Sequence, residues 1–139
     1  MVSRGLRNNN PGNIDFNPRN KWVGQTGIED HPNARFATFS DAKFGIRAIA
    51  RLLITYQEKH KLMSVFAIIN RWAPVVENDT NSYVHAVARK LGVGIRDNIN
   101  VRDRETAIVL VKAIILHENG SQPYPDGTIN RALEMAGIS

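Results

Sequence analysis

Apolar side chains recur at helical spacing along most of the chain beyond residue 40. One stripe with a period of 3.6 residues contains Phe44, Ala48, Ile49, Leu52, Leu53 and Tyr56. Ser40 can cap this helix, which we expect to run to about Lys59. Ser64 can cap a second helix that ends at Trp72, because a proline follows shortly after it.

Two further segments read as short amphipathic helices. The first begins at Thr80 or Asn81 and is stopped by Gly92. The second, near the end of the chain, can be capped by Thr128 and ends at Gly137.

The segment that begins at Asp103 and ends at Gly120 is apolar nearly all round. Its apolar members are Ala107, Ile108, Leu110, Val111, Ile114 and Ile115. A helix with no broad polar face is typical of a core position, so we expect this to be the buried central helix.

The first 40 residues have a different character, rich in Asn, Gly and Pro. Pro11-Gly12 favours a type II turn, in which Gly takes the positive φ. Short pieces with strand character, at residues 14–16, 22–25 and 35–39, predict a small β-hairpin region. The fold class is therefore mostly α (α+β). Without repeats, linkers or low-complexity tracts, residues 1–139 are expected to form a single domain.

Composition narrows the function classes. The chain has a formal net charge of +5 and no cysteine, which excludes disulfides and thiolate metal sites. A basic surface suits nucleic acid, anionic lipid or the bacterial cell wall. The basic residues form no run, however, so a solvated polar face explains them equally well. Neither a secretory signal nor a membrane span is visible, so a target outside the cytoplasm requires unconventional delivery.

The end of the predicted central helix carries the most informative chemistry. There Glu118 stands where an apolar helix meets a polar loop. Burial and the negative end of the helix dipole both favour a protonated carboxyl group. A glutamic acid kept protonated near neutral pH is what a glycosidase needs to protonate a leaving-group oxygen. An exposed glutamate without a role is the alternative.

Five short segments of the chain resemble lysozyme-like peptidoglycan-degrading proteins. His117-Glu118-Asn119-Gly120 resembles the Glu-Ser-Gly or Glu-Thr-Gly ending of the catalytic helix in lytic transglycosylases and glucosaminidases. Residues 7–14 (Arg-Asn-Asn-Asn-Pro-Gly-Asn-Ile), 22–26 and 36–39, followed by Leu-Leu-Ile-Thr-Tyr at 52–56, resemble the segment after that helix in glucosaminidases. The start of the chain is also similar to small phage structural proteins and endolysins.

The resemblance implies a lysozyme-like catalytic domain with Glu118 as acid and base. The order of the matching segments along this chain, however, differs from their order in glucosaminidases. In glucosaminidases the glutamate helix precedes the Asn-rich segment, whereas here it lies near the end of the chain. We interpret this order as a circular permutation, which domains tolerate when their termini are close.

The resemblance also implies further site residues. Glucosaminidases carry an auxiliary acid in the hairpin, which makes Glu29 the first choice, ahead of Asp30 and Asp126. Lytic transglycosylases need only one glutamate, so the second acid stays open. Amide, hydroxyl and aromatic groups that could contact sugar are Asn8, Asn9, Asn10, Asn13, Gln25, Trp72, Asn78, Thr80 and Tyr83, with Asp126 beside them. The asparagines could equally be turn residues, and the Trp72–Tyr83 stretch a joint between helices.

The four histidines show no metal-ligand spacing, so neither a metal nor another cofactor is expected. The leading hypothesis is a phage enzyme, of lytic transglycosylase, muramidase or glucosaminidase type, that acts on bacterial peptidoglycan. It would be carried in a virion or released from the host cytoplasm to the cell wall, with other virion proteins as further partners. A wall-binding or structural virion protein without turnover is the alternative. A helical nucleic-acid binder is a third hypothesis, but no helix–turn–helix pair is apparent.

Overall fold

The computed structural model describes residues 2–73 and 79–139. In these parts the chain forms six helices and one two-stranded antiparallel sheet. The helices are α1 (Arg4–Arg7), α2 (Ala42–Glu58), α3 (Val65–Trp72), α4 (Thr80–Leu91), α5 (Arg104–Asn119) and α6 (Asp126–Met135), and the strands are β1 (Gln25–Ile28) and β2 (Ala37–Phe39). The predicted fold class, mostly α with a small hairpin near the N-terminus, is confirmed.

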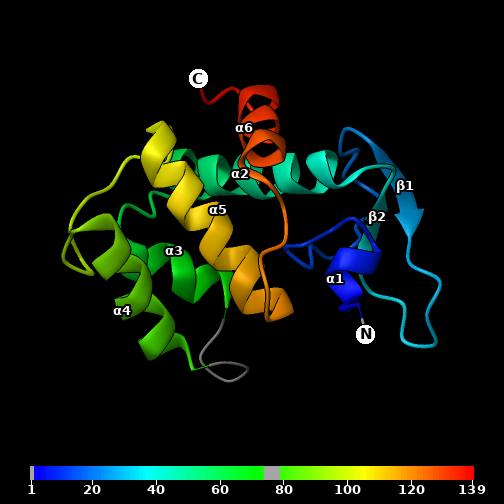
Figure 1. The fold of residues 1–139 in the computed structure, drawn as a ribbon, viewed down its shortest axis with the longest axis horizontal. Coiled ribbons are helices and arrows are strands. Elements are labelled where there is room, and N and C mark those ends of the chain that lie inside the picture. The colour runs from blue at the N-terminus through cyan, green and yellow to red at the C-terminus, as the bar shows by residue number, and fades with distance from the viewer. Residues whose placement is uncertain (1, 74–78) are drawn as a thin grey trace.

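Helix α5 is the central helix, as predicted. It contacts α1, α2, α4 and α6, and its fully buried side chains include Leu110, Ile114 and Ile115. Figure 1 shows α5 crossing α2, with α3 and α4 on one side and α1 with the hairpin on the other. The buried apolar side chains of these elements form one connected core.

Local capping explains most helix boundaries. Ser64 accepts a hydrogen bond from the backbone of Ala67, and Asp103 accepts one from Thr106, so both act as N-caps. Gly92 and Gly120 end α4 and α5 in the left-handed conformation that glycine adopts without strain.

Two predicted helix starts were wrong. Asp41 caps α2 instead of Ser40, because the Ser40 backbone N–H bonds to the Gly24 carbonyl in the hairpin. Helix α6 begins at Asp126, directly after Pro125 and two residues before Thr128, and has no side-chain cap. Thr128 instead lies inside the first turn, where its N–H bonds to the Pro125 carbonyl.

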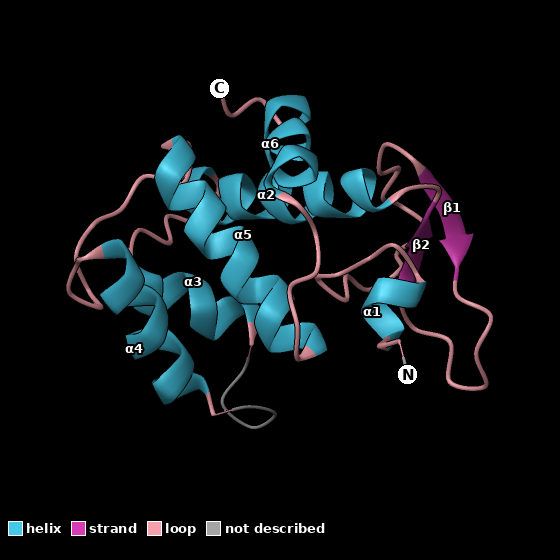
Figure 2. Ribbon diagram, viewed as in Figure 1, coloured by secondary structure: helices cyan, strands magenta, loops and turns pink. Residues whose placement is uncertain are grey.

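The hairpin is shifted from the predicted segments. Its strands pair Gln25 with Phe39 and Ile28 with Ala37, so β1 begins where the predicted strand ended. The expected strand at residues 14–16 is reduced to an isolated bridge between Asp15 and Phe36. Figure 2 shows the two strands of the hairpin as the arrows β1 and β2.

The turn at Pro11-Gly12 is not type II. Gly12 does not have a positive φ, whereas Asn9 and Asn13 do, at 54° and 49°. Glycine is needed at position 12 for space: an added Cβ would lie 2.7 Å from Ile49 Cγ1 and 2.9 Å from Trp72 Cζ2. The Asn-rich loop therefore packs directly on α2 and α3.

Candidate functional site

A cleft of about 440 Å³ lies where the N-terminal loop, the hairpin and the ends of three helices meet. The loop contributes Gly12, Asn13, Ile14 and Asp15, and the hairpin side contributes Arg35 and Phe36. Tyr56 comes from α2, Arg71 and Trp72 from α3, and Glu118 from α5. Of the predicted site residues, the structure brings Glu118, Asn13 and Trp72 together here.

Glu118 occupies the penultimate position of α5 and is half-buried on the cleft wall. The Asn13 side chain donates a hydrogen bond from Nδ2 to Glu118 Oε1 at 3.0 Å. Asn13 reaches this position with a left-handed backbone (φ 49°), which asparagine tolerates better than most residues. The amide therefore fixes the orientation of a carboxyl group that faces a solvent-filled cleft.

Asn119 fastens the N-terminal loop to the end of α5. Its Nδ2 donates to the Pro11 carbonyl at 2.7 Å and to the Ile115 carbonyl at 2.9 Å. Its Oδ1 accepts a hydrogen bond from Ser3 Oγ at 2.7 Å. The beginning of the chain thus lies against the residue that follows Glu118. The sequence identified Asn119 only as part of a motif, and this tethering role was missed.

Two aromatic side chains form an apolar wall in the cleft. Trp72 and Tyr56 pack edge to face, with ring centroids 5.9 Å apart and an interplanar angle of 66°. Burial raises the pKa of the Tyr56 phenol, while the charge of nearby Arg71 acts in the opposite direction. Aromatic faces next to polar groups are suited to sugar rings, which have C–H surfaces beside hydroxyls. From the sequence, Tyr56 is expected only as a member of the apolar stripe of its helix and of the Leu-Leu-Ile-Thr-Tyr segment at 52–56.

The three charged residues of the cleft other than Glu118 were not predicted. Asp15 Oδ1 and Arg35 Nε form an ion pair at 2.6 Å, with both side chains more than half exposed. The Arg71 guanidinium carbon lies 5.5 Å from the centroid of the Tyr56 ring. The adjacency of Arg71 and Trp72 is the one sequence signal that could have indicated Arg71.

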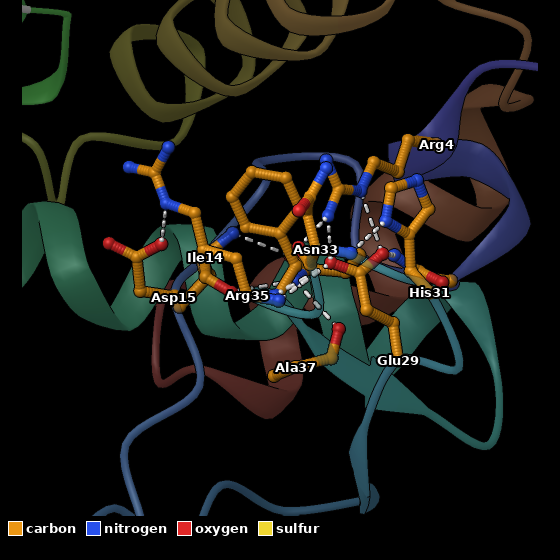
Figure 3. A network of polar contacts seen from close by, with 11 residues as sticks. Arg4, Ile14, Asp15, Glu29, His31, Asn33, Arg35 and Ala37 are labelled. Carbon is orange, nitrogen blue, oxygen red and sulfur yellow. Dashed lines mark hydrogen bonds and ion pairs between the residues drawn. The ribbon is translucent and has the colours of Figure 1, made fainter.

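Glu29, the predicted second acid, does not line this cleft. Its residue exposure is 4%, and both carboxylate oxygens are occupied. Arg4 donates from Nε to Oε1 at 2.8 Å and from Nη2 to Oε2. Asn8 Nδ2 also donates to Oε1, and the backbone N–H groups of Arg35 and Phe36 donate to Oε2 at 3.0 and 2.9 Å. Figure 3 shows this network between α1 and the hairpin.

These contacts give Glu29 a structural role. The Arg4 guanidinium holds the pKa of the Glu29 carboxyl well below its usual range, although burial alone would raise it. A carboxylate that stays ionised and enclosed cannot supply a proton to a substrate in the cleft. By bonding two consecutive backbone N–H groups, Glu29 positions Arg35 and Phe36, whose side chains do line the cleft.

Three of the four candidate asparagines in the N-terminal loop are structural. Asn8 is buried against Glu29, and Asn9 Nδ2 donates to the Phe39 carbonyl at 3.1 Å. Asn10 is fully buried; it donates to the Ile14 and Ala37 carbonyls and accepts from the Ile14 N–H. The side chain of Asn10 thus replaces strand partners where the predicted first strand does not form.

Tyr83 lies close to Glu118 but lines a different hollow. Its ring stacks on His117, with centroids 4.1 Å apart, beside a groove of about 350 Å³ that Ala113 and Leu116 also line. Burial raises the pKa of the Tyr83 phenol, and the Glu118 charge adds to the effect. Tyr83 is therefore not among the residues that line the cleft, although it stacks on His117, the neighbour of Glu118 in α5.

The remaining candidates are not among the residues that line the cleft. Thr80 is buried and bonds the Ala73 carbonyl at 2.8 Å, so it joins α3 to α4. Gln25 belongs to β1 and donates to the Asn20 carbonyl. Asp126 is exposed and pairs with Lys112 at 2.8 Å. Asp30 is exposed beyond β1, and Asn78 lies outside the described residues.

Residues 2–73 and 79–139 contain no group of three or more side chains suited to hold a metal ion. Within the same ranges, no helix combines the length and apolar character needed to span a bilayer.

Comparison with known proteins links the chain to a bacteriophage. No family model matches it. It is 41% identical to protein P5 of Pseudoalteromonas phage PM2 over 135 residues, which cover 96% of this chain and 81% of P5. The relationship confirms the bacteriophage affiliation predicted from the sequence.

Proposed function

The chain belongs to the family of phage protein P5, and from this premise we propose that it cleaves the glycan strand of bacterial peptidoglycan, with Glu118 as general acid and base. The observation that carries the proposal is the position of Glu118: at the end of the buried helix α5, hydrogen-bonded by Asn13, in a cleft lined by Trp72 and Tyr56. A protonated carboxyl group beside aromatic sugar platforms is the arrangement that glycosidic bond cleavage requires.

The packing of the N-terminal loop supports the permuted relationship to glucosaminidases. In those enzymes the Asn-rich segment follows the glutamate helix directly. Here the Ser3 hydroxyl lies 2.7 Å from Asn119 Oδ1, and Asn119 bonds Pro11. The Asn-rich segment therefore meets the end of the glutamate helix through side-chain contacts where the resembling proteins have a peptide connection.

In the proposed reaction, the Glu118 carboxyl group donates its proton to the glycosidic oxygen as the bond to the anomeric carbon breaks. Asn13 orients the carboxyl group, and Trp72 with Tyr56 contacts the sugar rings. In the single-glutamate route, the Glu118 carboxylate then takes a proton from the C6 hydroxyl of the muramic residue as that oxygen bonds to the anomeric carbon, which gives an anhydro sugar. In hydrolysis by inversion, a second carboxylate takes a proton from the attacking water, which gives a reducing end.

Asp15 is the candidate for the second acid in the proposed site. Within the described residues, Asp15 and Glu118 are the two acidic side chains that line the cleft. Inverting hydrolysis uses a second carboxylate to activate water. Asp15 forms an ion pair with Arg35, and both residues line the cleft that Glu118 also lines. If Asp15 does not take part, the single-glutamate route to the anhydro sugar remains.

Product analysis tests the proposal. Purified protein and an Asp15→Asn variant are incubated with purified Gram-negative sacculi, and the released fragments are identified by mass spectrometry. Glycan fragments with reducing ends that disappear in the variant indicate hydrolysis through Asp15. Anhydro-muropeptides released equally by both proteins indicate the single-glutamate route. Sacculus binding without any release would overturn the enzymatic proposal in favour of a wall-binding virion protein.

A further inference from the structure

Arg71 is a cation on the cleft wall, and none of the residues that the structure describes forms an ion pair with it. It lies in the last turn of α3, next to Trp72. Its guanidinium stands 5.5 Å from the Tyr56 ring centroid, and no described residue gives it a hydrogen bond or an ion pair. A cation–π contact of this kind does not use the N–H donors of the guanidinium. Arg71 therefore presents unused donors at the cleft.

The other arginine of the cleft differs in this respect. Arg35 has a carboxylate partner in Asp15, at 2.6 Å. When Glu118 is protonated, as its role as an acid requires, Arg71 is the remaining uncompensated charge among the described residues of the cleft. A planar guanidinium with free donors matches the two oxygens of a carboxylate in bidentate geometry.

From this geometry we infer that Arg71 binds a carboxylate of the substrate and makes the site select acidic muramyl glycans over neutral glycans. The inference rests on the proposed function for the identity of the glycan. A carboxylate can come from two places in peptidoglycan: the lactyl group of a muramic residue without a peptide, or the stem peptide. N-acetylglucosamine polymers have none, so they cannot use Arg71 in this way.

Binding measurements with three soluble tetrasaccharides test the inference. One carries stem peptides, one is a muramyl glycan stripped of peptide, and one is chitotetraose. All titrations use protein with the Glu118→Gln substitution, so that no ligand is cleaved. The test protein carries Arg71→Gln in addition. Arg89→Gln is the matched control, because Arg89 is an exposed residue of α4 that does not line the cleft. Arg71→Lys keeps the positive charge but loses the planar pair of N–H donors that can bind both oxygens of a carboxylate.

We expect Arg71→Gln to weaken binding of at least one acidic tetrasaccharide by roughly 10- to 30-fold, as for the loss of a charge-assisted hydrogen bond. Chitotetraose binding should change less than about twofold, Arg71→Lys should be intermediate, and Arg89→Gln should have no effect. Whichever acidic ligand is affected identifies the source of the carboxylate.

Equal loss for chitotetraose, equal loss in Arg89→Gln, or no loss for any ligand would each overturn the inference. Far-ultraviolet circular dichroism melting confirms that each variant is folded. Failure of the wild-type protein to cleave sacculi would overturn the proposed function alone, because these titrations measure binding in a variant without the acid.

Discussion

Replacing Glu29 with Gln separates the structural role of this residue from the catalytic role that the sequence suggested. In the folded protein the Glu29 carboxylate accepts hydrogen bonds from Arg4, Asn8 and two backbone N–H groups. A Gln carbonyl at the position of Oε2 can keep both backbone bonds. Its amide nitrogen then occupies the position of Oε1, where it faces the Arg4 Nε–H and the Asn8 amide, and the charge pair is lost.

The size of the effect follows from burial. Breaking a fully buried ion pair by removing one partner costs about 3–5 kcal/mol. The Glu29 side chain is 2% exposed but that of Arg4 is 30% exposed, so solvent compensates part of the loss. The Asn8 amide can also turn to accept from the new amide. We therefore expect Glu29→Gln to lower the free energy of unfolding by about 2–3 kcal/mol at pH 7. For a chain of this size that lowers Tm by roughly 8–10 °C.

The loss of stability in Glu29→Gln should be larger at neutral pH than at acidic pH. Because the folded-state pKa of Glu29 lies well below its ordinary value, the carboxylate stabilises the fold above that ordinary value. The stabilisation is lost as the pH falls below about 4, toward the folded-state pKa. The Tm difference between the wild-type protein and Glu29→Gln should therefore narrow from pH 7 to pH 3.

Circular dichroism melting between pH 3 and pH 7, together with sacculus cleavage well below Tm, is the assay. Glu58→Gln is the control, because the Glu58 and Arg102 side chains are both substantially exposed, and we expect little change in its Tm. Cleavage by folded Glu29→Gln should stay within about threefold of wild type, against the roughly 100-fold or greater loss expected for a general acid. An unchanged Tm with abolished cleavage would refute the structural assignment and restore Glu29 as an acid.

Further substitutions test other contacts. Asn13→Gly preserves the left-handed backbone but removes the bond to Glu118, so sacculus turnover should fall about tenfold while Tm stays within a few degrees; unchanged turnover would contradict the role of Asn13 in orienting Glu118. Gly45→Ala would press a Cβ against the Asn9 carbonyl, a backbone atom, and should cost about 2–3 kcal/mol in urea denaturation. Gly127→Ala, in helix α6 with open space at its Cβ, should instead raise stability by about 0.4–1 kcal/mol, and the same effect in the two variants would show that the loop–α2 contact is not tight.

Local signals were sufficient to predict the helices. Ser64, Asp103, Gly92 and Gly120 act within one turn of their own position, so the sequence alone indicates where helices begin and end. The errors arose where a distant partner intervenes. Ser40 could not be recognised as part of the hairpin connection, because its backbone partner is the Gly24 carbonyl.

The same distinction applies to the site. Glu118 could be predicted because a glutamate at the end of an apolar helix is unusual by itself, and Trp72 because it is an aromatic residue shortly before a proline and a polar stretch of sequence. Glu29 was misassigned because its buried partner, Arg4, is 25 residues away and belongs to another element. Arg71 and Asp15 were missed for a related reason. They line the same cleft only because α3 and the N-terminal loop pack together in the folded chain.

The most direct measurement of the central claim is the rate at which soluble muropeptides are released from sacculi by the wild-type protein, Glu118→Gln and Glu105→Gln. Glu105 is an exposed carboxylate in the first turn of the same helix, so the two variants make the same chemical change at opposite ends of α5. We predict that Glu118→Gln loses at least about 100-fold in rate while remaining folded, and that Glu105→Gln keeps the wild-type rate. Equal release by all three proteins would contradict the assignment of Glu118 as the acid and base.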